Sequence, residues 1–264
     1  MKNLIPALFI LLLVSSCKKE EINPGLLKEF TIQSAANGAA YCIKVALPEN
    51  YDPARKKYAT IYVLDGKENF DYVATKCKKL SSNYAVQNVL VVSIGYGYDR
   101  SIDYTPTKAS QGGGGAEKFM QFIAHELIPE IESTYAADTS RKSKVIIGHS
   151  FGGLLGAYAF ANFNHVFGNY LLLSPSLWYD NEILLRMEAA SRATNSTSEQ
   201  LVYMGIGGLE GNGRMQAPFE AFYQRLNHYY PAIKITKHIE NGLDHVGSKN
   251  PNISHALDYY FQNQ

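Results

Sequence analysis

A serine lies between two glycines in the segment GHSFG at residues 148–152. The apolar run at 144–147 precedes this segment, and a stretch with a helical pattern follows it at 154–163. A G-x-S-x-G sequence between a strand and a helix is typical of a nucleophile elbow, a tight turn that lifts the serine oxygen out of a sheet. The glycines leave room where side chains would clash, and the helix N-terminus favours negative charge. We therefore predict that Ser150 is a nucleophile.

A serine hydroxyl attacks well only when a base removes its proton. In proteins with this elbow the chain order is serine, then Asp or Glu, then histidine. His245 lies in the turn-rich loop at 241–247, after a predicted strand and before the last predicted helix. This position predicts His245 as the base. His255 is the alternative, but the pattern places it inside the final helix, 253–261.

Two carboxylates compete for the role of orienting the base. Glu210 lies on a glycine-rich loop after the predicted strand at 201–204, and this position favours it. Asp180, after the preceding predicted strand, is the alternative. Asp244 adjoins His245 in sequence and is poorly placed to reach its ring. A Ser–His pair without a firm acid is the third possibility, because the acid mainly fixes the tautomer and orientation of the histidine.

An acyl-transfer site also needs hydrogen-bond donors for the oxyanion that forms during the reaction. The backbone N–H of Phe151, directly after the nucleophile, is the first predicted donor. The second is expected in the loop after the apolar run at 59–64, and position selects the N–H of Lys67. An ordinary turn at the end of a strand is the competing interpretation of that loop.

Along the chain, the predicted strands that position these residues alternate with predicted helices. Apolar runs rich in β-branched residues predict strands that are buried on both faces, as in a parallel sheet covered by helices. Two alternating runs around Asn37-Gly38 predict an antiparallel hairpin. We expect a doubly wound α/β fold, mostly parallel, with this hairpin at one edge. The helical pattern at 117–135 should kink or break at Pro129, and Gly112–Gly115 is expected to be a flexible loop.

The charge balance restricts the class of partner. The 264 residues include 25 basic and 24 acidic side chains, for a formal net charge of +1. Such an even balance gives no long-range field for a phosphate backbone, so nucleic acid is not expected as a partner. The expected partner is a small-molecule ester. We see no cluster of metal ligands in the sequence, and the chemistry needs no cofactor.

The first residues are predicted to direct export. A basic start and a short apolar run resemble a signal peptide, and Val14-Ser15-Ser16-Cys17 resembles the lipobox of bacterial lipoproteins. We expect a signal peptide at 1–16, a lipidated Cys17 with a tether to residue 27, and a single domain at 28–264. The membrane is then contacted only through the lipid, on the periplasmic side or at the cell surface. A plain secretory peptide or an anchor helix is the alternative.

The other two cysteines, Cys42 and Cys77, fall in a predicted strand and a predicted helix. Export would permit a disulfide, and two separate buried thiols are an equal alternative.

Several motifs together resemble the esterase family of α/β-hydrolases, which includes esterase D-type and enterochelin-type siderophore esterases. The resemblance runs from about Phe30 to the C-terminus. It implies the α/β-hydrolase fold, Ser150 and His245 as nucleophile and base, and an oxyanion hole shared by Phe151 and Lys67. The matching segments are LPENY (47–51), YVLDG (62–66), IGY (94–96), RSIDYTPT (100–107), GHSFGG (148–153), SPSLW (174–178) and Asp244-His245.

The resemblance also implies substrate contacts from Arg100, Tyr104 and Trp178, for which an Arg–Asp pair that pins a loop is the structural alternative. The implied activity is ester hydrolysis through an acyl-enzyme. Siderophore lactones and aromatic or acetyl esters of glycans are the candidate substrates. An acyltransferase with the same site, or a binding lipoprotein without catalysis, would share this sequence pattern.

Overall fold

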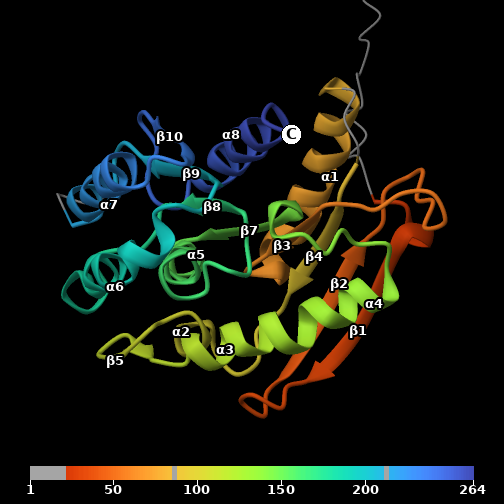
Figure 1. Cartoon of the computed structure of the whole chain (residues 1–264), viewed down its shortest axis with the longest axis horizontal. Helices are drawn as coiled ribbons and strands as arrows, with labels where there is room; N and C mark the ends of the chain where they lie inside the picture. Colours follow the sequence, from red (N-terminus) through yellow and green to blue (C-terminus); the bar gives the residue numbers. More distant parts are fainter. Residues whose placement is uncertain (1–21, 85–87, 211–213) are drawn as a thin grey trace, which may run out of the picture.

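The computed structural model describes residues 22–84, 88–210 and 214–264, and an eight-stranded sheet runs through its centre (Figure 1). The strand order is β1-β2-β4-β3-β7-β8-β9-β10. The strands are β1 (Leu27–Gln33), β2 (Ala40–Ala46), β3 (Thr60–Val63), β4 (Leu90–Ile94), β7 (Lys144–His149), β8 (Asn169–Leu173), β9 (Gln200–Gly207) and β10 (Ile233–Glu240). The β1–β2 and β2–β4 pairs are antiparallel and the others are parallel. This confirms the predicted fold class and the N-terminal hairpin.

Helices cover both faces of this sheet. Figure 1 shows α1 and α8 on one side and α3, α5 and α6 on the other. Successive residues of a strand point to opposite faces, so Ile61 and Val63 pack with α1 and α8, whereas Tyr62 and Leu64 pack with the opposite layer. The helices are α1 (Gly66–Tyr84), α2 (Arg100–Asp103), α3 (Ala116–Phe122), α4 (Ile128–Thr134), α5 (Phe151–Asn162), α6 (Tyr179–Asn195), α7 (Gln216–Tyr229) and α8 (Lys249–Phe261), with 3₁₀ turns at Pro24–Leu26 and Arg141–Ser143.

A π-helical turn, Ile123–Leu127, joins α3 to α4. The N–H of Ile128 donates to the carbonyl of Ile123, five residues earlier, and Pro129 follows in the first turn of α4. The predicted irregularity is therefore present, as a π turn just before the proline. Within this turn the Glu126 carboxylate accepts hydrogen bonds from the backbone of Ala35 and Ala36, which ties the helix to the β1–β2 turn.

The expectation of a flexible loop at Gly112–Gly115 is wrong. Gly112–Gly113 forms strand β6, which pairs with β5 (Lys108–Ala109). A β-carbon on Gly112 would lie 2.5 Å from the side chains of Thr105 and Tyr179. The glycines are needed because this hairpin packs closely against its neighbours, a tertiary requirement that composition alone does not reveal.

Both cysteines in the described ranges are free thiols. Cys77 on α1 is buried, as the alternative of two buried thiols expected, but Cys42 on β2 is exposed, so that expectation is wrong for Cys42. Burial raises the pKa of the Cys77 thiol. The predicted signal peptide, Cys17 and the tether up to residue 21 lie outside the described residues. Among the helices of the described ranges, none is both long and apolar enough to cross a membrane.

Candidate active site

Ser150 occupies a sharp turn between β7 and α5. Its φ of +61° and ψ of −118° are unusual for a residue with a side chain. Its backbone N–H donates to the carbonyl of Leu173 on the neighbouring strand at 2.9 Å. A β-carbon on Gly148 would approach the backbone of Gly152 to 2.5 Å, so only glycine fits there. The predicted elbow is present.

Backbone strain collects at the carboxyl edge of the sheet. Among the described residues, six that are not glycine have a positive φ. Ser150 and Ser174 directly follow β7 and β8, and Asp65 is the second residue after β3. The other three, Asp180–Glu182, interrupt the start of α6. Strained residues cluster at functional sites, and ligands of open α/β sheets bind at this edge. Both observations identify this edge as the candidate site.

Glu210 and His245 meet at this edge. Glu210 follows β9, and His245 lies in the loop between β10 and α8. The Nδ1 of His245 donates to Oε2 of Glu210 at 2.7 Å, which leaves Nε2 as the nitrogen that can take a proton. The glutamate side chain is fully buried, whereas the histidine side chain is 37% exposed. The structure thus brings together the favoured acid and base.

The second oxygen of Glu210 is also fully occupied. Its Oε1 accepts from the hydroxyl of Ser174 at 2.5 Å, from the N–H of Gly207 at 2.6 Å and from the hydroxyl of Ser248 at 3.0 Å. Burial raises the pKa of Glu210, but the hydrogen bonds from His245, Ser174 and Gly207 outweigh burial, so this pKa lies below its ordinary value. The carboxylate stays ionised and fixed. Sequence reasoning missed these donors, which come from the residue after β8, the end of β9 and the residue before α8.

Ser150 and His245 line one cleft of about 350 Å³. No hydrogen bond joins them within the described chain; the Ser150 hydroxyl lies 3.5 Å from that of Ser176. Contacts of this kind are often loose before substrate binds and tighten in the complex. The cleft is lined by Asp65, Glu68, Asn69, Tyr96, Arg100, His149, Ser150, His245, Val246 and Lys249.

His149 is a neighbour of the base that sequence reasoning treated only as part of the elbow. Its Nε2–H donates to the backbone carbonyl of His245 at 2.9 Å, and the centres of the two rings are 4.5 Å apart. Burial, together with the nearby His245, lowers the pKa of His149 to about 4. A neutral His149 therefore holds the loop of the base in place near pH 7.

The competing candidates lie elsewhere. Asp180 accepts a hydrogen bond from Thr107 at 2.6 Å, and Asp244 accepts one from the N–H of Gly247 within its own loop. His255 is on α8 and pairs with Glu240. In the described chain, none of the three forms a hydrogen bond or an ion pair with Ser150 or Glu210. Geometry therefore favours Glu210 and His245 over them.

The two predicted oxyanion donors both belong to first helical turns. Phe151 is the first residue of α5, and Lys67 is the second residue of α1. Backbone N–H groups in a first turn have no acceptor within their helix, and the helix dipole makes them attractive to an anion. Their shared role in an oxyanion hole stays a prediction.

The predicted substrate contacts divide into three cases. Arg100 lines the cleft, but its guanidinium is bound to both oxygens of Asp65 at 2.7 and 2.9 Å. Tyr104 is 1% exposed, and its hydroxyl accepts from the N–H of Asp65. The expectation that Tyr104 contacts substrate is therefore wrong, because the side chain is buried beneath the cleft. Trp178 lines a separate hollow, where Arg214 lies 3.7 Å from the centre of its ring.

Residues 34–245 match the family described as Putative esterase. The chain is 30% identical over 176 residues to a siderophore triacetylfusarinine C esterase of Aspergillus fumigatus, a match that covers 61% of this chain and 60% of that relative. It is 27% identical to the ferri-bacillibactin esterase BesA of Bacillus subtilis, over 78% of this chain and 82% of the relative.

Solved structures include proteins that are similar to this chain in fold. An IroE-like serine hydrolase from Shewanella oneidensis superposes with a TM-score of 0.79 at 25% identity, covering 90% of this chain and 80% of that one. The family match spans most of the domain and includes Ser150, Glu210 and His245. This confirms the predicted resemblance: the chain belongs to the esterase family, whose members it resembles in fold as well as in sequence.

Proposed function

We propose that this chain is a serine carboxylic-ester hydrolase that works through an acyl-enzyme. The observation that carries the proposal is the contact of His245 with the buried, ionised Glu210 in the same cleft as Ser150 on its strained elbow. A base held in one tautomer, in the same cleft as a half-buried serine, is what nucleophilic catalysis on a carbonyl requires.

The steps follow from these residues. Ser150 Oγ attacks the ester carbonyl carbon as its proton passes to Nε2 of His245, and Glu210 stabilises the resulting imidazolium. The N–H groups of Phe151 and Lys67 hold the oxyanion. The C–O bond to the alcohol then breaks, and His245 gives its proton to the leaving oxygen. Water adds to the acyl-enzyme with the same base, releasing the carboxylic acid and restoring the serine.

We propose siderophore esters or lactones as the substrates. Two of the relatives are named as a siderophore triacetylfusarinine C esterase and a ferri-bacillibactin esterase, and the cleft has the size of a small-molecule site. Tyr96 and Lys249 line it and offer an aromatic face and a cation for an acidic aromatic chelator. Aromatic and acetyl esters of glycans are the competing substrates in the test.

The mechanism is tested with a fluorophosphonate probe and para-nitrophenyl acetate. Replacing Ser150 with Ala should abolish labelling and lower turnover by roughly a millionfold, as in other triad enzymes. Ser176→Ala is the matched control, since its hydroxyl lies 3.5 Å from that of Ser150, and it should still be labelled. Labelling that survives in Ser150→Ala but disappears in Ser176→Ala would reject the assigned nucleophile.

The substrate is tested by comparing kcat/KM for a catecholate trilactone siderophore and for feruloyl sugar esters. We expect the siderophore to be cleaved more efficiently. If the feruloyl esters react faster while Ser150→Ala still removes all activity, the siderophore assignment is wrong and the serine mechanism stands.

We further propose that the protein is exported and anchored to a bacterial membrane through lipid on Cys17. The lipobox-like segment before this cysteine supports the proposal, and several acyl chains on one residue would anchor it stably. In a bacterial host fed radiolabelled palmitate, the full chain should carry label and sediment with membranes. The Cys17→Ser variant should do neither, and label retained by that variant would contradict the proposal.

A further inference from the structure

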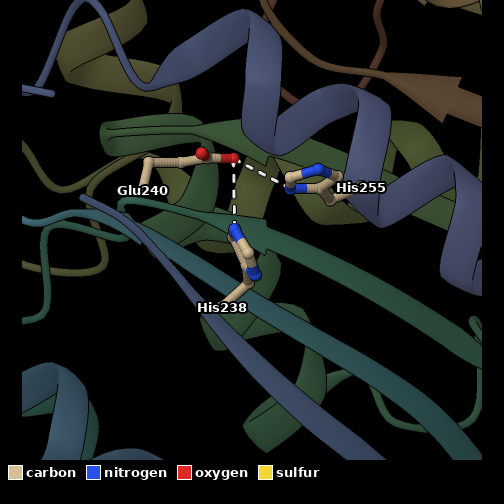
Figure 2. Close-up of side chains that lie close together, drawn as sticks. All are labelled: His238, Glu240 and His255. Carbon is tan, nitrogen blue, oxygen red and sulfur yellow. Dashed lines mark ion pairs between the residues drawn. The ribbon is translucent and has the colours of Figure 1, made fainter. Parts of the chain in front are cut away.

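A second cluster of histidine and glutamate side chains lies outside the catalytic cleft, and Figure 2 shows its members pointing toward one another. His238 and Glu240 belong to β10, and His255 belongs to α8, which packs beside that strand. We propose that His238, Glu240 and His255 bind a divalent metal ion of the zinc class, in a site that braces the loop of His245.

The distances between the ligand atoms suit one shared ion. Glu240 Oε1 lies 2.9 Å from Nδ1 of His255 and 3.5 Å from Nε2 of His238. One ligand atom from each residue falls within 4.8 Å of the others. With zinc–ligand bonds of about 2.0–2.1 Å, two ligands of a tetrahedral ion are separated by about 3.3 Å. Small side-chain rotations are therefore enough to close the site.

The glutamate oxygen at the centre faces both histidines without forming a hydrogen bond of good geometry. Within the described chain, Glu240 Oε1 is buried and has no hydrogen bond, although it lies at ion-pair distance from His255. The Glu240 side chain is only 12% exposed. A buried carboxylate oxygen is costly unless it is well paired, and a bound cation would pair this oxygen more closely than its contacts of 2.9 and 3.5 Å with the two histidines.

The kinds of ligand select the ion. Two imidazoles and one carboxylate are a typical set for zinc, whereas calcium and magnesium prefer oxygen ligands. The side chains of His238 and His255 are 42% and 49% exposed, so an ion can enter from solvent and water can take a fourth position. Copper or nickel would also bind such a set, and cobalt is a convenient spectroscopic substitute.

The position of this site relates it to the catalytic base. His238 and Glu240 lie at the end of β10, His255 lies in α8, and the connecting loop carries His245. Within that loop the N–H of Leu243 donates to the carbonyl of Glu240, and its carbonyl accepts from Leu209, next to Glu210. An ion shared by β10 and α8 fixes both ends of this loop. Here the metal acts on positioning and takes no part in the ester chemistry.

The direct test is zinc binding by calorimetry with the whole domain after removal of any histidine tag. We expect one zinc per chain, and a tetrahedral cobalt absorption spectrum when cobalt replaces zinc. Each of the variants His238→Gln, Glu240→Gln and His255→Gln should bind zinc at least about tenfold more weakly. His228→Gln, an exposed histidine on α7, is the matched control and should bind like the wild type.

Two further measurements and one further variant test the proposal. Zinc should raise the thermal midpoint of the wild type and slow amide hydrogen exchange in residues 241–248, but do neither in His255→Gln. Absence of zinc binding to the wild type would overturn the site. So would full affinity in all three variants, or loss of binding in His245→Gln, which would place the ion at the catalytic centre. These outcomes do not depend on ester hydrolysis, so they are separable from a failure of the proposed function.

Discussion

The loop between β10 and α8 has a His–Glu contact on each side, and the two contacts differ. On the catalytic side, Glu210 receives a hydrogen bond from His245 on one oxygen and three hydrogen bonds on the other. On the other side, Glu240 lies between His238 and His255, with one oxygen that has no hydrogen bond in the described chain.

Histidine exposure does not separate the two sites. The side chains of His245, His238 and His255 are 37%, 42% and 49% exposed. The two sites differ instead in the groups that surround their carboxylates. A fully hydrogen-bonded glutamate holds one histidine in one tautomer, which suits proton transfer. A buried glutamate without such bonds, flanked by two histidines, suits a cation.

Among changes to these two His–Glu contacts, Glu210→Gln is expected to have the largest effect, and Glu240→Gln tests the contrast. Glu210→Gln should lower kcat by about 10⁴-fold, because the amide no longer holds His245 in the productive tautomer or stabilises the imidazolium. Glu240→Gln, the matched control, should leave kcat within a few-fold of the wild type in metal-free buffer. Steady-state hydrolysis of para-nitrophenyl acetate measures both. A large loss in Glu240→Gln with little loss in Glu210→Gln would reverse the assignment of the two carboxylates.

A smaller effect is expected from His149, which adjoins the catalytic pair. Its pKa is about 4 in the folded protein against an ordinary value of 6.5. The unfolded chain therefore binds more protons between these values, so stability is complete above about pH 6.5 and falls as the pH drops toward 4. Between pH 7 and pH 5 the free energy of unfolding should decrease by about 2 kcal/mol from this group alone.

Urea unfolding at the two pH values checks this expectation. The variant His149→Gln keeps a donor for the carbonyl of His245 but cannot titrate, so its stability should change less with pH than that of the wild type. His165→Gln, at an exposed position, is the control and should retain the wild-type pH dependence. An unchanged pH dependence in His149→Gln would show that His149 does not titrate as described.

Local patterns in the sequence predict the elbow and the order of the catalytic residues. Ser150 is identified by its strand–turn–helix context, and Glu210 and His245 by their loops after strands, because parallel strands bring such loops to one edge. The burial of Tyr104 was not predictable in this way, since it depends on packing beneath Asp65. The cluster of His238, Glu240 and His255 was missed because its ligands come from two elements that only the fold brings together.

The π turn at Ile123–Leu127 is equivalent to one extra residue inserted into a regular helix. Each residue of an α-helix advances the side chains by about 100°. Deleting one residue from this turn would restore a regular helix but rotate the segment after it, carrying the fully buried Ile131 away from the core. Length in this segment is therefore constrained more tightly than residue identity: related chains can exchange side chains there more readily than they can lose a residue.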